Sequence, residues 1–340
     1  MNGLPRNRLL VGYALEQLKT LQDASVDTVI PSPPYFRLRD YETADQLGLE
    51  THVDQWVDAL VDVAAEVARV LVPTGSLWLN VGDTFATHPS QGASRKSLLL
   101  APERLAKRLT EAGWTLRNKI VWSKANPVPT SVRDRLTATH EFIYVLVRQP
   151  RYFFDLDAVR LPHTSRLSKA RIQTVGLGRE DWRGPNAAGA DGLAKIKAEG
   201  RVGHPLGKNP GDTWVMASST YRGAHHATYP LRLAERMLLA GCPEARCTLC
   251  RTPWQRSTIR ALGQEAVRGA LAPACDCGAP SEPGLVLDPF IGSGTTAVAA
   301  ERHGRDWLGI ELNPAFARQA AERIQQARSR RTVASDGAAA

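Results

Sequence analysis

The sequence predicts an α/β fold built on a doubly wound, mostly parallel sheet. Short apolar segments alternate with longer amphipathic ones along most of the chain, as is typical of strands connected by helices. The length of 340 residues suits one large α/β domain, or a catalytic domain with a small module. Hydrophobic residues make up 43% and charged residues 23%, which is the composition of a globular protein and not of a disordered one.

The first half of the chain gives the clearest alternation of the two kinds of segment. Strands are expected at 8–12, 26–30, 76–81, 115–123 and 140–148, and helices at 14–21, 54–71 and 98–112. The second strand ends at Pro31, because prolines cannot continue a ladder of hydrogen bonds. The most apolar stretch, 56–72, is interrupted by four charged residues. It therefore predicts an amphipathic helix and not a membrane span.

The alternation resumes in the second half, after a basic, glycine-rich segment. Helices are expected at 231–240, 295–302 and 315–328, and strands at 285–288 and 307–310. Small and polar residues follow, and we expect 329–340 to be a flexible tail. No signal peptide and no membrane span is recognisable, so we expect a cytoplasmic protein.

The formal net charge of +9 is concentrated in the middle of the chain. Between Arg160 and Lys208, ten basic residues face four acidic ones, and the same segment contains eight glycines. A flexible basic segment suits a nucleic-acid backbone, because each neutralised phosphate releases counterions. A solvated surface loop has the same composition, so charge alone leaves both interpretations open.

A glycine-rich turn connects the strand at 285–288 to the following helix. Gly292 and Gly294 let the backbone approach a ligand at the carboxyl end of the sheet, where doubly wound folds bind nucleotides. Glu311 ends the next strand, where an acidic side chain can accept hydrogen bonds from ribose hydroxyls. The absence of a lysine after the glycines excludes a P-loop, and their spacing disfavours a dinucleotide. A ligand that carries a nucleoside is therefore predicted.

The tetrapeptide Ser32-Pro33-Pro34-Tyr35 is the most informative motif. The prolines fix the backbone, Ser32 and the Pro33 carbonyl supply acceptors, and Tyr35 supplies a flat face. Such a set can hold an aromatic amine, with its two N–H groups on the oxygens and its ring on the tyrosine. A rigid structural turn is the alternative. Phe36 could add a wall to this site or belong to the core.

All five cysteines fall between 242 and 277, which indicates a metal site. Cys247 and Cys250 form one close pair, and Cys275 and Cys277 form another, as expected for a tetrahedral structural zinc. Cys242 is left as a spare or substitute ligand. Buried reduced thiols are the alternative, but the region is too polar to form a core of its own. Whether its arginines (Arg246, Arg251, Arg256 and Arg260) contact a nucleic acid stays open.

These motifs together resemble the amino-group DNA methyltransferases, which methylate N4 of cytosine or N6 of adenine. The Ser-Pro-Pro-Tyr motif looks like their catalytic motif, and 288–296 looks like their S-adenosylmethionine motif. Residues 309–314 resemble the ribose-binding motif, and 226–230 resemble the segment that encloses the methionine end of the cofactor. The catalytic motif comes first, as in the circularly permuted β-class. The resemblance covers roughly 8–165, 210–241 and 284–325.

The resemblance implies a circularly permuted, Rossmann-like methyltransferase sheet with an inserted target recognition region and a small zinc module. The catalytic part is expected at 1–159, the target recognition region at 160–212, the cofactor-binding part at 213–241 and 284–328, and the zinc insert at 242–283. The implied cofactor-binding residues are Asp288, Phe290, Gly292, Gly294, Thr295, Glu311, Asn313 and His226. Tyr13 stands where the family usually has an aspartate near the adenine, so weaker cofactor binding is expected. Pro31 replaces a small hydroxyl residue.

The implied chemistry is direct attack by the target amine on the sulfonium methyl group of S-adenosylmethionine. The base would be flipped out of duplex DNA and stacked on Tyr35, with Ser32 and Pro33 orienting the amine. Serine at the first motif position favours cytosine N4, and adenine N6 is the alternative. Asp83 could line the pocket or cap a helix, and Lys124 and His140 could touch DNA or solvate the surface.

The resemblance also bears on partners and on a competing class of function. Double-stranded DNA is the expected partner, in a bacterial or phage-encoded protein associated with the nucleoid. A cognate restriction endonuclease and a homodimer are left open, and no membrane is expected. From another class, a non-catalytic zinc-containing DNA-binding protein on a decayed methyltransferase scaffold would account for Tyr13.

Overall fold

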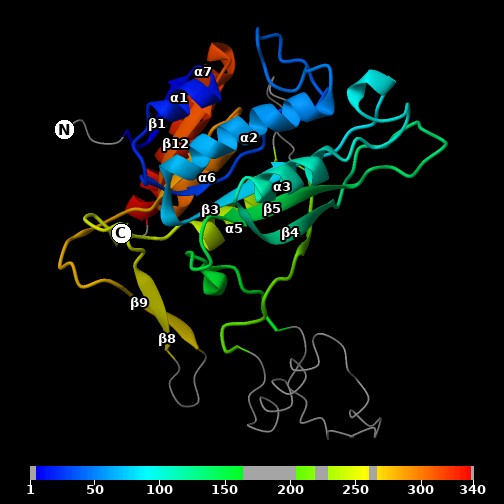
Figure 1. Cartoon of the computed structure of the whole chain (residues 1–340). Coiled ribbons are helices and arrows are strands. Elements are labelled where there is room, and N and C mark those ends of the chain that lie inside the picture. The colour runs from blue at the N-terminus through cyan, green and yellow to red at the C-terminus, as the bar shows by residue number, and fades with distance from the viewer. Residues whose placement is uncertain (1–4, 164–203, 219–228, 260–265, 338–340) are drawn as a thin grey trace, which may run out of the picture.

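The computed structural model describes residues 5–163, 204–218, 229–259 and 266–337, and side chains up to 329. Its centre is an eight-stranded sheet (Figure 1). In spatial order the strands are β1 (Arg8–Val11), β12 (Asp306–Glu311), β11 (Leu285–Asp288), β2 (Val26–Val29), β3 (Leu71–Val81), β5 (His140–Val147), β4 (Thr115–Lys124) and β6 (Thr213–Met216). The first and last parts of the chain thus meet at one end of the sheet.

The sheet is mostly parallel, as predicted, with one exception. β5 runs antiparallel to both of its neighbours, β3 and β4, while every other neighbouring pair is parallel. The central strands β2 and β11 are buried along their whole length, as expected for strands covered on both faces. The carboxyl ends of the parallel strands and the amino end of β5 therefore share one edge of the sheet.

Helices cover both faces of the sheet. One face carries α1 (Ala14–Lys19), α2 (Val53–Val70) and α3 (Ala101–Glu111), and the other carries α5 (Leu231–Gly241), α6 (Thr295–His303) and α7 (Pro314–Gly337) (Figure 1). Two short 3₁₀ turns, Pro89–Gln91 and Leu156–Ala158, complete the body. No helix in the described ranges is long and apolar enough to cross a membrane.

Three features differ from the predicted elements. β6 adds an edge strand that the sequence analysis did not predict. α7 continues past residue 328, where we expected a tail, because the chain carries no glycine or proline before Gly337. The segment 242–283 forms two small sheets: β7 (Arg246–Cys247) with β10 (Ser281–Glu282), and the projecting hairpin of β8 (Gln255–Ile259) and β9 (Val267–Ala272) (Figure 1). We call this segment the cysteine module.

Candidate active site and cysteine cluster

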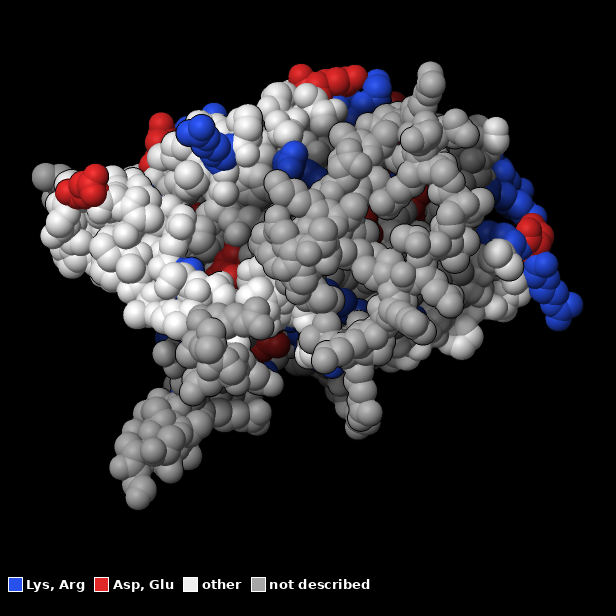
Figure 2. Space-filling view, turned by 90° about the horizontal axis from the view of Figure 1, so that it is seen from below, with Lys and Arg blue, Asp and Glu red and all other residues white. Residues whose placement is uncertain are grey.

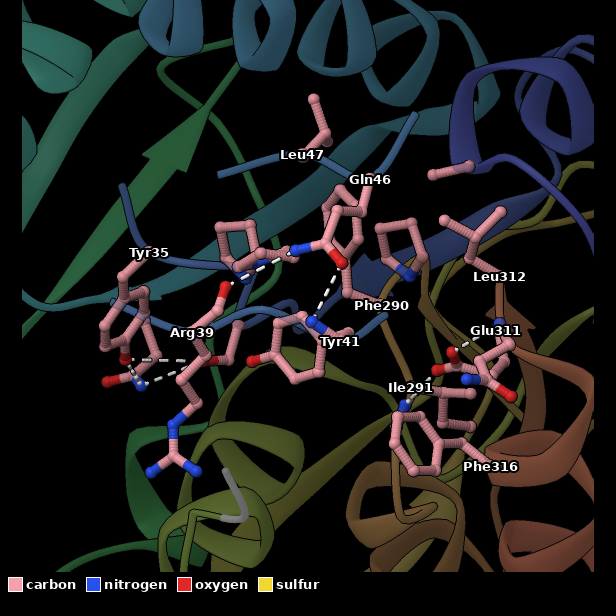
Figure 3. A pocket seen from close by; sticks show the side chains of 18 of the residues that line it. Tyr35, Arg39, Tyr41, Gln46, Leu47, Phe290, Ile291, Glu311, Leu312 and Phe316 are labelled. Atoms are coloured by element: carbon pink, nitrogen blue, oxygen red, sulfur yellow. Dashed lines mark hydrogen bonds between the residues drawn. The ribbon is translucent and has the colours of Figure 1, made fainter. Parts of the chain in front are cut away.

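A cavity of about 520 Å³ opens at the carboxyl edge of the sheet. It brings together the Ser-Pro-Pro-Tyr turn (32–35), which follows β2, and the glycine loop (288–296), which follows β11. Tyr35 and Glu311 mark its two ends, with Tyr41 between them (Figure 3). Two motifs that lie more than 250 residues apart in the sequence therefore share one cavity.

The Ser-Pro-Pro-Tyr turn is held by backbone contacts on both sides. The amide of Asn80 donates to the Pro31 carbonyl (3.0 Å), and the indole Nε1 of Trp56 donates to the Pro34 carbonyl (2.9 Å). These bonds leave all four residues of the turn lining the cavity. Phe36, by contrast, is 1% exposed and packs in the core. The turn is thus a fixed wall of the cavity.

A chain of polar side chains fixes Tyr35 inside the cavity. The Tyr35 hydroxyl donates to Glu141 Oε2 (2.7 Å), and Asn80 Nδ2 donates to the same carboxylate (3.0 Å) and to the Tyr35 hydroxyl (2.9 Å). Ser32 Oγ lies 3.3 Å from Asn80 Nδ2 and 3.4 Å from the Tyr35 hydroxyl. Burial and the neighbouring Glu141 charge raise the pKa of Tyr35 well above its usual value, so the hydroxyl keeps its proton.

Sequence reasoning missed Asn80 and Glu141. Both come from strands whose ends meet only when β5 enters the sheet between β3 and β4. Lys124 lines the same cavity and forms an ion pair with Glu141 Oε1 (2.6 Å). His140 lies outside the cavity lining, with its ring against Phe142 at 5.1 Å. The sequence signal that could have identified Asn80 and Glu141 is a polar residue at the end of a strand at this edge of the sheet.

Asp83 does not line the cavity. Its carboxylate accepts from the amides of Leu100 (3.0 Å) and Ala101 (3.1 Å), at the start of α3. Of the two roles expected for Asp83, the structure therefore shows helix capping.

The glycine loop and Glu311 form the other end of the cavity. Gly292 and Gly294 have φ values of 49° and 80°, a conformation that favours glycine. Glu311 Oε2 accepts from the Gly292 amide and Oε1 accepts from the Asn313 amide, both at 2.9 Å. Burial raises the pKa of Glu311. Each carboxylate oxygen keeps a second lone pair, so Glu311 can still accept from a ligand hydroxyl.

The predicted cofactor residues divide into two groups. The cavity lining includes Phe290, Gly292, Thr295, Glu311 and Asn313. Asp288 and Gly294 lie behind it, and His226 lies outside the described residues.

Asp288 organises the loop from behind. Its Oδ1 accepts from the Phe290 amide (3.0 Å), and its Oδ2 accepts from the hydroxyls of Thr296 (2.6 Å) and Tyr229 (3.2 Å). Burial raises the pKa of Asp288 to about 7. We conclude that Asp288 shapes the loop for a ligand that it does not face.

Residues 38–47, the covering loop, form a wall that the sequence did not reveal. Asn313 Nδ2 donates to Thr43 Oγ1 (3.3 Å), and the rings of Tyr41 and Phe316 meet edge to face at 6.4 Å. Gln46 braces the loop by accepting from the Tyr41 amide (2.8 Å) and donating to the Arg39 carbonyl (3.3 Å) (Figure 3). The loop therefore spans the space between the two ends of the cavity.

Tyr13 joins the covering loop. Its hydroxyl donates to the Ala44 carbonyl (3.2 Å) and to Asp45 Oδ2 (3.3 Å), and both Tyr13 and Asp45 line the cavity. A carboxylate is therefore present beside Tyr13, although it comes from another segment of the chain.

Four cysteines of the cysteine module form a cluster. The Sγ atoms of Cys247, Cys250, Cys275 and Cys277 all lie within 4.8 Å of one another. Four thiolates at this spacing suit a tetrahedral zinc. Cys242 is not part of the cluster: it is fully buried, and burial raises the pKa of its thiol. The structure thus separates the four predicted ligands from the spare cysteine.

Arg246, next to this cluster, connects the module to the sheet. Its side chain is 0% exposed, and Nη1 donates to Asp27 Oδ2 (2.7 Å) and to the Ser25 carbonyl (2.9 Å). Its Nε donates to Glu282 (2.8 Å). The question of whether Arg246 contacts DNA is therefore answered: it is a buried anchor. Arg256 bonds to Glu244, and Arg260 lies outside the described residues.

Comparison with known proteins agrees with this geometry. Residues 26–322 match the N6/N4 methyltransferase family, described as DNA methylase. The type II methyltransferase M.Cfr9I of Citrobacter freundii is 30% identical over 339 residues, which cover 93% of this chain and 87% of that protein. TTHA0409 of Thermus thermophilus, complexed with S-adenosyl-L-methionine, superposes with a TM-score of 0.53 at 25% identity and covers 95% of this chain and 96% of that one. The PvuII DNA methyltransferase (cytosine-N4-specific) has the same fold, with a TM-score of 0.56 at 18% identity over 96% and 93% of the two chains.

Proposed function

Because this chain belongs to the N6/N4 family of DNA methylases, we propose that it transfers a methyl group from S-adenosylmethionine to N4 of cytosine in duplex DNA. The observation that carries the proposal is the single cavity with the Ser-Pro-Pro-Tyr turn at one end and Glu311 at the other. One end suits an aromatic amine and the other suits a nucleoside. A methyl donor and its acceptor can therefore meet between them.

The residues at the glycine-loop end fit S-adenosylmethionine. The positive φ angle at Gly292, which lines the cavity, lets the backbone approach a ligand, and Glu311 offers its remaining lone pairs to ribose hydroxyls. Phe290 and Phe316 supply apolar walls for a base. When bound, S-adenosylmethionine supplies an electrophilic methyl group on a positively charged sulfur.

The residues at the Ser-Pro-Pro-Tyr end prepare the amine for attack. Ser32 Oγ and the Pro33 carbonyl would accept the two amine N–H bonds, which directs the nitrogen lone pair at the methyl carbon. Asn80 and Glu141 hold Tyr35 in place as the surface on which the base stacks. An amine inside a duplex cannot reach these acceptors, so the base must first leave the duplex. Direct transfer needs no covalent intermediate, and no cysteine lines the cavity among the described residues.

The choice of cytosine rests on the family association of serine at position 32 with N4 methylation. Adenine also presents an amine beside a ring acceptor, so N6-adenine methylation is the other outcome of the test. We further propose that residues 160–212, most of which lie outside the described residues, recognise the target sequence. As a type II enzyme the protein would protect DNA from a cognate restriction endonuclease.

The cysteine cluster is proposed to hold one structural zinc ion. Its four sulfur donors match the ligand set of closed structural zinc sites, which leave no position for a substrate. The zinc would therefore order the module without entering the methyl transfer.

Incubation with S-adenosylmethionine, zinc and unmethylated duplex DNA, followed by nucleoside mass spectrometry, tests the proposal. N4-methylcytosine is the expected product, and N6-methyladenine would reverse the base. Sequencing that detects methylation then locates the modified position. The proposal fails if neither product forms on a DNA library of random sequence and calorimetry detects no cofactor binding. That result would favour a non-catalytic DNA-binding protein on a decayed methyltransferase scaffold.

A further inference from the structure

The loop between β4 and β5, residues 125–139, begins and ends at the cavity. Lys124, Val128 and Glu141 line the cavity, while the middle of the loop extends away from the body (Figure 1). The Lys124 amide donates to the Thr139 carbonyl (2.8 Å), which closes the base of the loop. The loop is therefore a projection from the rim of the proposed active site.

Leu136 on this loop is 92% exposed, the highest value among the large hydrophobic side chains in the described ranges. The residues just before Leu136 are held in place by two contacts. Asp134 forms an ion pair with Lys96 (2.6 Å), and the Arg135 guanidinium lies over the Phe85 ring at 3.6 Å. The two residues before Leu136 are thus held against the neighbouring segment 85–96, while Leu136 itself faces solvent and leaves apolar surface in water.

The loop that carries Leu136 and the segment beside it are rich in positive charge. The loop and the segment that it packs against (85–96) contain one acid, Asp134, and four cations: Arg95, Lys96, Arg133 and Arg135. Lysine and arginine side chains gather at the end of the molecule where the loop lies (Figures 1 and 2). This charge is complementary to a phosphate backbone.

We propose that Leu136 enters the DNA stack where the target base leaves it. The proposal rests on the proposed function, because only an enzyme that removes a base from the duplex leaves a gap to fill. Apolar side chains inserted between base steps are an established means of holding a duplex in a distorted form. Leu136 lies five positions before Glu141, so the chain places the leucine at most about 18 Å from the cavity rim.

The test measures kcat/KM for methylation on two duplexes that contain the located target. In one duplex the target is correctly paired, and in the other an abasic position lies opposite it, so that little pairing energy opposes flipping. Leu136→Ala is compared with wild type and with Leu249→Ala, which truncates another exposed leucine (73%) on the cysteine module. Calorimetry with S-adenosylmethionine checks that each variant is folded.

We expect Leu136→Ala to lower kcat/KM about tenfold on the paired duplex and to stay within about twofold of wild type on the abasic duplex. Leu136→Met should restore activity on the paired duplex, and Leu249→Ala should match wild type on both. If Leu136→Ala leaves kcat/KM unchanged, or lowers it equally on both duplexes, Leu136 does not enter the DNA stack as proposed. Either result leaves the proposed function intact. A folded wild type that methylates neither duplex overturns both.

Discussion

The cavity edge and the cysteine module achieve order by different means. At the cavity edge, side chains from the turn after β2 and from β3 and β5 bond to one another at the end of a sheet that is covered on both faces. In the cysteine module, β8 is exposed along its whole length, and the fully buried strand β7 has only two residues. Apolar burial thus positions the first region, whereas ion pairs and the proposed zinc site hold the second.

Metal removal should separate the two regions most sharply. Structural zinc sites of this kind bind with free energies on the order of 10 kcal/mol, so the module should lose its order without metal. We expect about one zinc ion per chain by elemental analysis, and its loss in Cys250→Ser. Limited proteolysis should then cut within 242–283. Cys242→Ala is the matched control and should keep the metal, because Cys242 lies outside the cluster. Equal metal loss in both variants would contradict the four-ligand assignment.

The buried ion pair that connects the cysteine module to the sheet should give the next largest effect on stability. Arg246→Ala leaves Asp27 buried without its partner, so the free energy of unfolding should fall by about 3–5 kcal/mol in urea denaturation. Arg256→Ala breaks a partly exposed pair with Glu244 and should cost less than about 1 kcal/mol. The double variant Arg246→Met, Asp27→Leu should recover much of the loss. Similar losses for Arg246→Ala and Arg256→Ala would show that burial of the pair contributes little.

Inside the cavity edge, Ser32→Ala tests the proposed acceptor. Loss of one preorganised partner of the reacting group lowers kcat about a hundredfold to a thousandfold in comparable sites. The dissociation constant of S-adenosylmethionine should not change, because Ser32 lies at the opposite end of the cavity from Glu311. Ser94→Ala, at an exposed position, is the control. A normal kcat in Ser32→Ala would assign the turn a structural role only.

Glu141→Gln tests the support of Tyr35. Glutamine can still accept from the Tyr35 hydroxyl, but Lys124 loses its anionic partner, so we expect kcat to fall about tenfold. The control is Glu103→Gln, which neutralises the partner of Lys119 in an ion pair that is more exposed than Lys124–Glu141. This variant should leave kcat unchanged. If both variants behave alike, the polar chain around Tyr35 does not support catalysis.

The two regions also differ in what the sequence could reveal. The Ser-Pro-Pro-Tyr turn, the glycine loop and Glu311 were predictable because each is a short motif at the end of a strand. The four clustered cysteines were predictable from spacing alone. The fold itself is confirmed as that of S-adenosylmethionine-dependent DNA methyltransferases.

What escaped prediction depends on contacts between distant segments. Glu141 reaches Tyr35 only because β5 runs antiparallel between β3 and β4, and a pattern of apolar residues does not specify strand order. The covering loop has no periodicity, and its contacts with Asn313 and Phe316 join segments about 270 residues apart. The buried role of Arg246 could not be predicted because its partner, Asp27, lies 219 residues away in the sequence.

Tyr13 should give the smallest effect, and it tests how far the cavity edge tolerates a departure from the family motif. The Tyr13 hydroxyl bonds to Ala44 and Asp45 at 3.2 and 3.3 Å, and both hydrogen bonds are exposed to solvent, which weakens their contribution. Tyr13→Phe should therefore weaken S-adenosylmethionine binding about threefold by calorimetry, because the covering loop is held less firmly. Leu15→Met, a conservative change at another residue that lines the same cavity, is the control.

Tyr13→Asp distinguishes two explanations of the departure. If the chain lacks a carboxylate that it needs, the new aspartate should tighten cofactor binding. If Asp45 already supplies that carboxylate, a second one beside it adds like-charge repulsion, and binding should weaken further than in Tyr13→Phe. Asp45→Asn should then weaken binding as well. The contact between Tyr13 and Asp45 favours the second result, in which a residue of the covering loop has replaced one of the motif.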